Sequence, residues 1–309
     1  MFEKVVLVTR KTRLEELIER FNTRAQARFY IEHAGGHFET YEKEHEAYQR
    51  SLEVVRRSIE VGLKIQVIDR GFLPTYLFAP TDVIVTLGQD GLVANTAKYV
   101  KGQPILGVNP DVERFDGILL PLLPKDLKVH LEQTLLNRAR VRLVTMAEAC
   151  LRDGQRLVAF NDLFIGVRSH ISARYRLTYA GQTEDQSSCG VIVSTGAGSS
   201  GWLSSIFNET IGIVSFLGGK PVRPIQMDWE EASLLFVVRE PFVSRHSNAG
   251  IVAGNVSPGA PLTIESQMPT AGVIFSDGVE SDSLDFNSGA IATIGIAPER
   301  ANLVMGGTR

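Results

Sequence analysis

The first third of the chain alternates short β-branched runs with stretches that carry apolar residues at helical spacing. The strand-type runs are residues 5–9, 65–68, 83–87 and 104–109, and the helical stretches are residues 14–21, 41–63 and 92–100. Strands that alternate with helices are typical of a parallel, doubly wound sheet. We therefore expect residues 1–125 to form an α/β domain with a Rossmann-like parallel sheet.

The pattern changes near residue 125, where one helical stretch is followed by many short strands separated by turns. The helix is expected at residues 127–136, and the strand-type runs include 156–160, 163–167, 173–179, 189–194, 234–238, 262–264, 273–275 and 291–296. Many short strands at this spacing are typical of a sandwich. We expect a β-rich, sandwich-like domain over residues 126–309, with the boundary at residues 121–128.

Composition and charge narrow the range of partners. The chain has 309 residues, 44% of them hydrophobic, and a formal net charge of −3, so general binding to nucleic acid or an anionic membrane has little electrostatic support. No apolar run reaches the ~18 residues that a membrane helix needs. A strand-type run follows Met1 almost directly, which leaves no room for a signal peptide and predicts a cytoplasmic protein. With only Cys150 and Cys189, neither a disulfide framework nor a zinc cluster is expected.

The turn Gly88-Gln89-Asp90-Gly91 is the first of three polar clusters that interrupt apolar strands. Glycines at the carboxyl end of a strand let the backbone approach a ligand, and the following helix directs its positive end there. Because Asp90 would repel a phosphate, we expect it to handle a proton or a metal ion. The alternative is a tight turn in which Asp90 only caps the helix.

Asn161 and Asp162 form the second cluster, between two apolar runs. A carboxylate accepts hydrogen bonds, and a neighbouring amide both donates and accepts them. This combination suits the paired hydroxyls of a ribose. The alternative is an Asx turn that joins two strands.

The third cluster is the loop Ser194-Thr195-Gly196-Ala197-Gly198-Ser199-Ser200-Gly201, which directly follows a strand-type run. Its glycines match Gly-x-Gly-x-x-Gly, but a dinucleotide fingerprint also needs a βαβ unit and an acidic residue roughly 20 residues further on. No clear unit of that kind follows. Clustered glycines and hydroxyls still suit a nucleotide held by backbone amides and Ser/Thr bonds, and a plain surface loop is the alternative.

Several common chemistries have no motif in this chain. The sequence contains no Gly-x4-Gly-Lys-Ser/Thr loop, no Gly-x-Ser-x-Gly elbow and no Cys/His pattern at zinc spacing. Of six histidines, His170 and His246 lie near arginines, and we expect both at solvated surface positions. No metal site made of protein side chains is predicted.

Taken in order, the three clusters resemble the motifs of the NAD kinase family, which are Gly-Gly-Asp-Gly, then Asn-Glu, then a Thr-x-Thr-Gly-Ser-type loop. Further stretches are most similar to the subgroup that includes the mitochondrial-type NAD kinase of animals, and the resemblance runs from about residue 80 to residue 296. These stretches are Gly107-Val108-Asn109, Glu113-Arg114 with Gly117, Phe164-Ile165-Gly166, Ser172-Ala173-Arg174-Tyr175, Val238-Arg239-Glu240-Pro241 and Asp285-Phe286-Asn287-Ser288-Gly289-Ala290-Ile291-Ala292.

The resemblance implies transfer of the γ-phosphoryl group of ATP to the adenosine ribose 2′-hydroxyl of NAD, which gives NADP. Asp90 would accept the proton of that hydroxyl, and Mg²⁺ would travel on the ATP phosphates. The resemblance further implies a homo-oligomer, most simply a symmetric dimer. Gly88 and Gly91 would admit phosphates, Asn161 and Asp162 would hold a ribose, and a nucleotide pocket would be lined by Thr195, Gly196, Gly198, Ser199 and Ser200, with Trp202 nearby.

Four departures from the family pattern keep other functions open. Gln89 replaces the second glycine and Leu92 replaces a hydroxyl residue. Asp162 replaces glutamate, and Cys189 stands where many bacterial members carry an aspartate that contacts the dinucleotide. The alternatives are polyphosphate as donor, another hydroxyl acceptor such as a lipid, sugar or nucleoside, and dinucleotide binding without turnover. A Rossmann oxidoreductase that uses the glycines of the third cluster is a further alternative.

Overall fold

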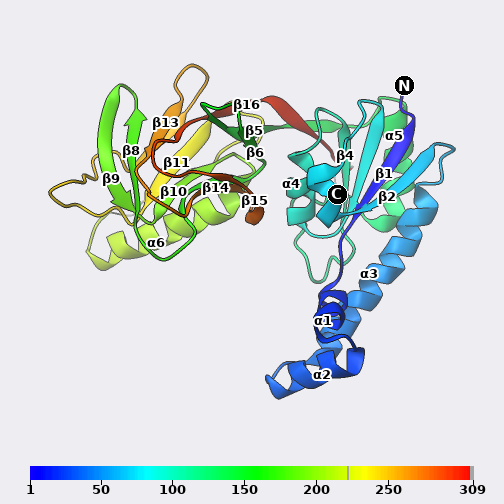
Figure 1. Cartoon of the computed structure of the whole chain (residues 1–309). Coiled ribbons are helices and arrows are strands. Elements are labelled where there is room, and N and C mark those ends of the chain that lie inside the picture. Colours follow the sequence, from blue (N-terminus) through cyan, green and yellow to red (C-terminus); the bar gives the residue numbers. More distant parts are fainter. Residues whose placement is uncertain (221–222, 307–309) are drawn as a thin grey trace. The chain divides into compact units, whose positions relative to one another are not determined.

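The structure is a computed structural model that describes residues 1–220 and 223–306 (Figure 1). The chain forms two compact units: unit 1 comprises Met1–Arg142 together with residues 302–306, and unit 2 comprises Leu143–Ala301. The boundary at Arg142 lies beyond the expected one at residue 125, because helix α5 (Leu127–Leu135) packs into the core of unit 1. Within the described residues, no helix has the length and apolar character needed to cross a membrane.

Unit 1 contains a parallel sheet in the order β2-β1-β3-β4. Its strands are β1 (Lys4–Thr9), β2 (Lys64–Asp69), β3 (Asp82–Leu87) and β4 (Pro104–Val108). Its other elements are α1 (Arg13–Phe21), α2 (Arg24–His33), α3 (Phe38–Ser58), η1 (Arg70–Thr75), α4 (Asp90–Ala97), η2 (Pro124–Asp126) and α5. The predicted α/β domain with a parallel sheet is thereby confirmed.

Strand β3 is buried along its whole length because helices cover both faces of this sheet. Alternate strand residues such as Val5 and Val85 pack with residues of α3 and α5 on one face. Helix α4 lies against the other face (Figure 1). A Cβ atom placed at Gly107 of β4 would lie 3.1 Å from Val93 Cγ2 of this helix. This burial on both sides explains why β3 is a continuous apolar run instead of an alternating one.

Unit 2 contains a six-stranded antiparallel sheet in the order β12-β11-β10-β7-β14-β15. A second layer is formed by β16-β13-β8-β9 with β5 and β6, and strand β16 ends in unit 1, where it pairs with β4. The strands are β5 (Val141–Leu151), β6 (Arg156–Ala159), β7 (Asp162–Val167), β8 (Ala173–Tyr179), β9 (Gln182–Ser188), β10 (Gly190–Ser194), β11 (Leu234–Arg239), β12 (Ala253–Val256), β13 (Leu262–Ser266), β14 (Gly272–Ser276), β15 (Val279–Asp285) and β16 (Ile291–Val304). The predicted β-rich, sandwich-like character is confirmed.

One helix of unit 2 was not expected from the sequence pattern. Residues Trp202–Phe216 form α6, preceded by the short turn η3 (Gly198–Ser200). Trp202 and Ile206 pack against Phe164 and Ile192 on the outer face of the six-stranded sheet. Leu163 and Ile165 point the opposite way, into the core between the two layers. The alternation along β7 therefore gives this sheet two apolar faces, and α6 covers part of the outer one.

Candidate functional site

The turn Gly88-Gln89-Asp90-Gly91 lies in unit 1, at the carboxyl end of β3 and the start of α4. A Cβ atom at Gly88 would lie 2.9 Å from Leu92 Cδ2 and 3.2 Å from Arg10 Cδ, so side chains of the protein already fill that space. At Gly91 nothing lies within 4 Å of such an atom. Gln89 has φ −92°, which any residue adopts, so replacing a glycine by Gln89 causes no backbone strain.

Asp90 is the first residue of α4 and is half-buried. Gln89 is the N-cap residue and its side chain makes no capping hydrogen bond. Asp90 Oδ1 instead accepts a hydrogen bond of 2.6 Å from the backbone amide of Leu119. The alternative in which Asp90 only caps its own helix is therefore wrong: a contact distant in the sequence orients its carboxylate.

In unit 2, Asn161 and Asp162 lie where β6 ends and β7 begins. The amides of Phe160, Asn161 and Asp162 all donate to the carboxylate of Asp277, at 3.0, 2.6 and 3.2 Å. The acceptor that shapes this turn thus comes from a distant residue, and not from the Asn161 side chain as in an Asx turn.

Burial raises the pKa of the Asp162 carboxyl to about 7, and the negative charge of Asp277 adds to this shift. The hydroxyl of Ser194 acts in the opposite direction by hydrogen bonding. Asp162 Oδ1 is buried and has no hydrogen-bond partner within the described residues. A buried oxygen without a partner is costly, so this group is a candidate for binding a donor such as a hydroxyl.

The loop between β10 and α6 packs closely against the rest of unit 2. A Cβ atom at Gly196 would lie 2.1 Å from Asp228 O, and one at Gly198 would lie 2.3 Å from Asn161 O. Thr195 is fully buried, and its hydroxyl donates to Phe160 O at 2.6 Å. Approach of protein backbone therefore accounts for both glycines, without a ligand.

Ser199 and Ser200 form the accessible end of this loop, although the Ser199 hydroxyl donates to Gly196 O at 2.6 Å. The strand before the loop, β10, pairs with β7 and β11, and both pairings are antiparallel. A Rossmann fingerprint requires a parallel βαβ unit, so the oxidoreductase alternative has no structural support here.

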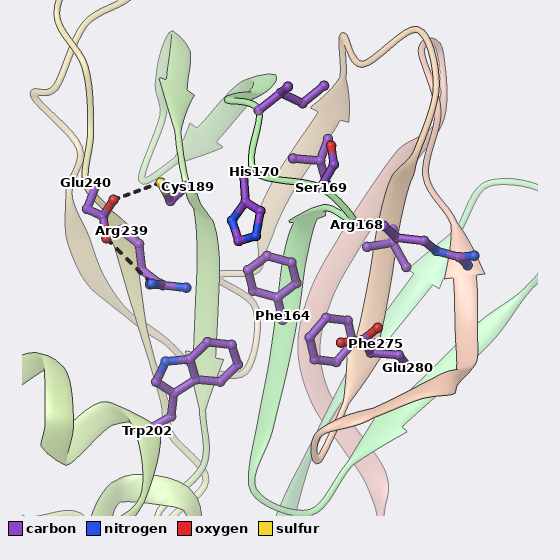
Figure 2. Close-up of a pocket in the computed structure, with 13 residues that line it drawn as sticks. Phe164, Arg168, Ser169, His170, Cys189, Trp202, Arg239, Glu240, Phe275 and Glu280 are labelled. Atoms are coloured by element: carbon purple, nitrogen blue, oxygen red, sulfur yellow. Dashed lines mark hydrogen bonds and ion pairs between the residues drawn. The ribbon is translucent and has the colours of Figure 1, made fainter.

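A pocket of about 450 Å³ lies on the outer face of the six-stranded sheet, wholly within unit 2 (Figure 2). Aromatic rings form its floor: Phe164 stacks on Trp202 with ring centroids 5.7 Å apart and on Phe275 at 4.8 Å. Cys189 lies on its wall, next to Glu240 and Arg239. Stacked rings beside charged groups suit a flat heterocycle with polar edges.

Charged side chains surround these rings. The Arg239 guanidinium lies 5.4 Å from the Trp202 ring centroid and 3.6 Å from the Glu240 carboxylate. The Cys189 thiol donates to Glu240 Oε2 at 2.9 Å, and this hydrogen bond raises the pKa of the thiol. His170 is exposed, as expected, and it also lines the pocket, where it faces Phe164 in Figure 2.

The predicted residues fall into three groups. Gly88, Gln89, Asp90 and Gly91 lie in unit 1, whereas Asn161 and Asp162 contact the loop that carries Thr195 to Ser200 in unit 2. Cys189 lies in the aromatic pocket. The sequence reasoning missed Asp277 and the pocket residues Phe164, Phe275, Arg239 and Glu240, although alternation along β7 and β14 marks both phenylalanines as facing away from the core.

Within residues 1–220 and 223–306, no group of three or more His, Cys, Asp or Glu side chains is placed to hold a metal ion. Asp90, which was expected to handle a proton or a metal ion, is thus not part of a metal-ligand cluster in the described chain. The Asp90 carboxylate is oriented by the hydrogen bond from the Leu119 amide.

Neither a family model nor a curated protein matches the sequence. Solved structures match the fold. A yeast NADH kinase complexed with NADH has a TM-score of 0.60 at 16% sequence identity, and the match covers 99% of this chain and 84% of that one. An NAD kinase from Archaeoglobus fulgidus in complex with ATP has a TM-score of 0.55 at 18% identity, covering 97% of this chain and 93% of that one. The chain therefore has the fold of these NAD and NADH kinases.

Proposed function

We propose that the protein is an NAD kinase-like phosphotransferase that moves the γ-phosphoryl group of ATP to the adenosine ribose 2′-hydroxyl of NAD. The observation that carries the proposal is the retained Asp90, oriented at the start of α4 in a chain with the fold of NAD and NADH kinases. Asp90 would accept the proton of the attacking hydroxyl, since the Leu119 amide occupies only one of its two oxygens.

The start of α4 is also suited to phosphate. Gly91 is exposed, and the first amides of the helix carry its positive partial charge. Mg²⁺ would arrive on the donor phosphates and neutralise their charge, because the described residues form no cage of their own. The chain's own contribution to the donor is then the backbone of the Gly88–Gly91 turn.

Unit 2 offers features that suit the dinucleotide. The unpartnered Oδ1 of Asp162, next to Asn161, suits ribose hydroxyls. The stacked rings of Phe164, Trp202 and Phe275 suit a base or a nicotinamide ring. These features favour a dinucleotide over a lipid acceptor, because a lipid chain would need a larger apolar cavity without charged walls.

The test is formation of NADP⁺ by purified protein given NAD⁺, Mg²⁺ and either ATP or polyphosphate. Asp90→Asn should lower turnover at least ~100-fold while NAD⁺ binding is nearly unchanged. Asp126→Asn, which changes a carboxylate just before α5, is the matched control and should keep wild-type turnover.

Each other result has a distinct meaning. Equal turnover in Asp90→Asn contradicts the base assignment. ADP without NADP⁺ indicates a different hydroxyl acceptor. A melting temperature that rises with NAD⁺ although no product forms indicates a dinucleotide-binding protein without turnover.

A further inference from the structure

Asp277 and Gly278 form the two-residue turn between β14 and β15, where Ser276 pairs with Val279. Both turn residues have positive φ, +53° for Asp277 and +71° for Gly278. Two such residues in a hairpin loop are typical of a type I′ turn, for which Asp-Gly is a favoured sequence. The turn explains why a small polar residue stands at 277, but it leaves the use of the carboxylate open.

That carboxylate is directed at the second polar cluster. Oδ2 accepts from the amide of Phe160, and Oδ1 accepts from the amides of Asn161 and Asp162. The amide of Asp277 in turn donates to Asp162 O at 3.0 Å. One charged group therefore fixes three consecutive peptide units by hydrogen bonds of the stronger, charge-assisted kind.

The same segment is held from its other side by the loop that follows β10. The Thr195 hydroxyl donates to Phe160 O, and the Thr195 amide donates to Asn161 O at 2.9 Å. The backbone of Asn161 and Asp162 is thus fixed, whereas Asp162 Oδ1 is buried and has no hydrogen-bond partner within the described residues. A rigid backbone that carries unused polar groups is the arrangement of a preorganised binding site.

We propose that Asp277 is a positioning residue: through the backbone hydrogen bonds that its carboxylate accepts, it fixes Asn161 and Asp162 for the hydroxyls of a ribose of the dinucleotide. The inference rests on the proposed function, in which these two residues hold a ribose. In this role Asp277 acts through the backbone of residues 160–162, whose amides donate to its carboxylate.

The charge effect has a defined sign. The described groups that act on the Asp162 carboxyl are Ser194 on β10 and Asp277 on the β14–β15 turn, and the nearby negative charge of Asp277 adds to the effect of burial in raising its pKa. Ribose hydroxyls donate to an ionised carboxylate. NAD⁺ affinity should therefore increase as Asp162 ionises, and removing the charge of Asp277 should move this increase to lower pH.

The experiment compares Asp277→Asn with wild type by NAD⁺ titration calorimetry between about pH 5 and pH 9. Asparagine suits the type I′ turn but carries no charge and has one acceptor oxygen fewer. We expect an affinity about tenfold lower at neutral pH and a midpoint of the pH dependence that lies at lower pH. Hydrogen exchange of the 160–162 amides should also be faster.

Two further variants separate charge from structure. Asp277→Glu keeps the charge, so its midpoint should stay at the wild-type value even where its affinity falls. Asp153→Asn removes a carboxylate that accepts the Gln155 amide in the turn between β5 and β6, and it should change neither exchange at 160–162 nor NAD⁺ binding.

An unchanged midpoint in Asp277→Asn, or unchanged exchange at the 160–162 amides, would overturn the inference. If Asp277→Asn does not fold, Asp277→Glu is used in its place. The inference then requires that the 160–162 amides exchange faster in Asp277→Glu than in wild type. If wild type does not bind NAD⁺, the proposed function is refuted, but the positioning role of Asp277 is not. The exchange measurement tests the positioning of Asn161 and Asp162 without any ligand.

Discussion

Two glycines of the turn after β3 serve different purposes. Gly88 is enclosed by Leu92 and Arg10, whereas Gly91 faces open space at the start of α4. Gly91→Ala should therefore change the free energy of unfolding by less than about 0.5 kcal/mol. If donor phosphates approach the amides there, the same variant should raise the KM for ATP several-fold. Urea denaturation and steady-state kinetics measure the two effects.

Gly88→Ala is the matched comparison, because its methyl group would meet protein atoms and not a ligand. We expect it to lower the free energy of unfolding by about 1–3 kcal/mol. A KM for ATP that is the same in Gly91→Ala and wild type would place the donor phosphates elsewhere.

The loop after β10 and helix α6 each contain a glycine, and replacing these two glycines by alanine should have opposite effects on the stability of the protein. Gly198→Ala would place a methyl group 2.3 Å from Asn161 O and should destabilise the protein by at least about 2 kcal/mol. Gly212 lies inside α6 with nothing within 4 Å, so Gly212→Ala should stabilise by about 0.5–1 kcal/mol. Thermal unfolding of both variants checks these signs, and a neutral Gly198→Ala would contradict the close packing.

The elements predicted best are those whose hydrophobic pattern can be recognised within one short stretch of sequence. The apolar run of β3 and the helical spacing within α3 both appear in the structure close to the expected ranges. Helix α6 was missed, because its sequence is apolar around most of its circumference and follows a glycine-rich loop without a side-chain cap. A periodic face, which is the main signal for a surface helix, is weak in such a segment.

The sequence predicted only part of the candidate site, because several of its contacts join residues that are distant in the sequence. Asp90 and Asn161-Asp162 were found because each interrupts an apolar run at a strand end. The roles of Gly196 and Gly198 depend on backbone from Asp228 and Asn161, which no local pattern reveals. Asp277 is likewise 115 residues from Asp162 in sequence, so its contact with that segment follows from strand order and not from spacing.

The free energy of unfolding of the whole molecule should depend on pH through the titration of the Asp162 carboxyl. Its folded-state pKa of about 7 lies above the value of about 3.9 expected in an unfolded chain. Folding therefore retains a proton that the unfolded chain releases. The contribution of this group to stability is fully present below about pH 4 and is lost as pH rises through about 7. Asp162→Asn cannot titrate, so the difference between the unfolding free energies of variant and wild type should increase in favour of the variant across this window.

Urea denaturation of both proteins at several pH values measures that difference, and groups that titrate in both proteins cancel from it. Asp153→Asn serves as the control. The Gln155 amide lowers the pKa of Asp153, so this group changes the pH dependence of stability only at pH values below its pKa in the unfolded chain. If the unfolding free energies of Asp162→Asn and wild type differ by a constant amount between about pH 4 and pH 7, Asp162 is solvated in the folded protein. Its carboxylate would then be less suited to bind a hydroxyl in a site that excludes water.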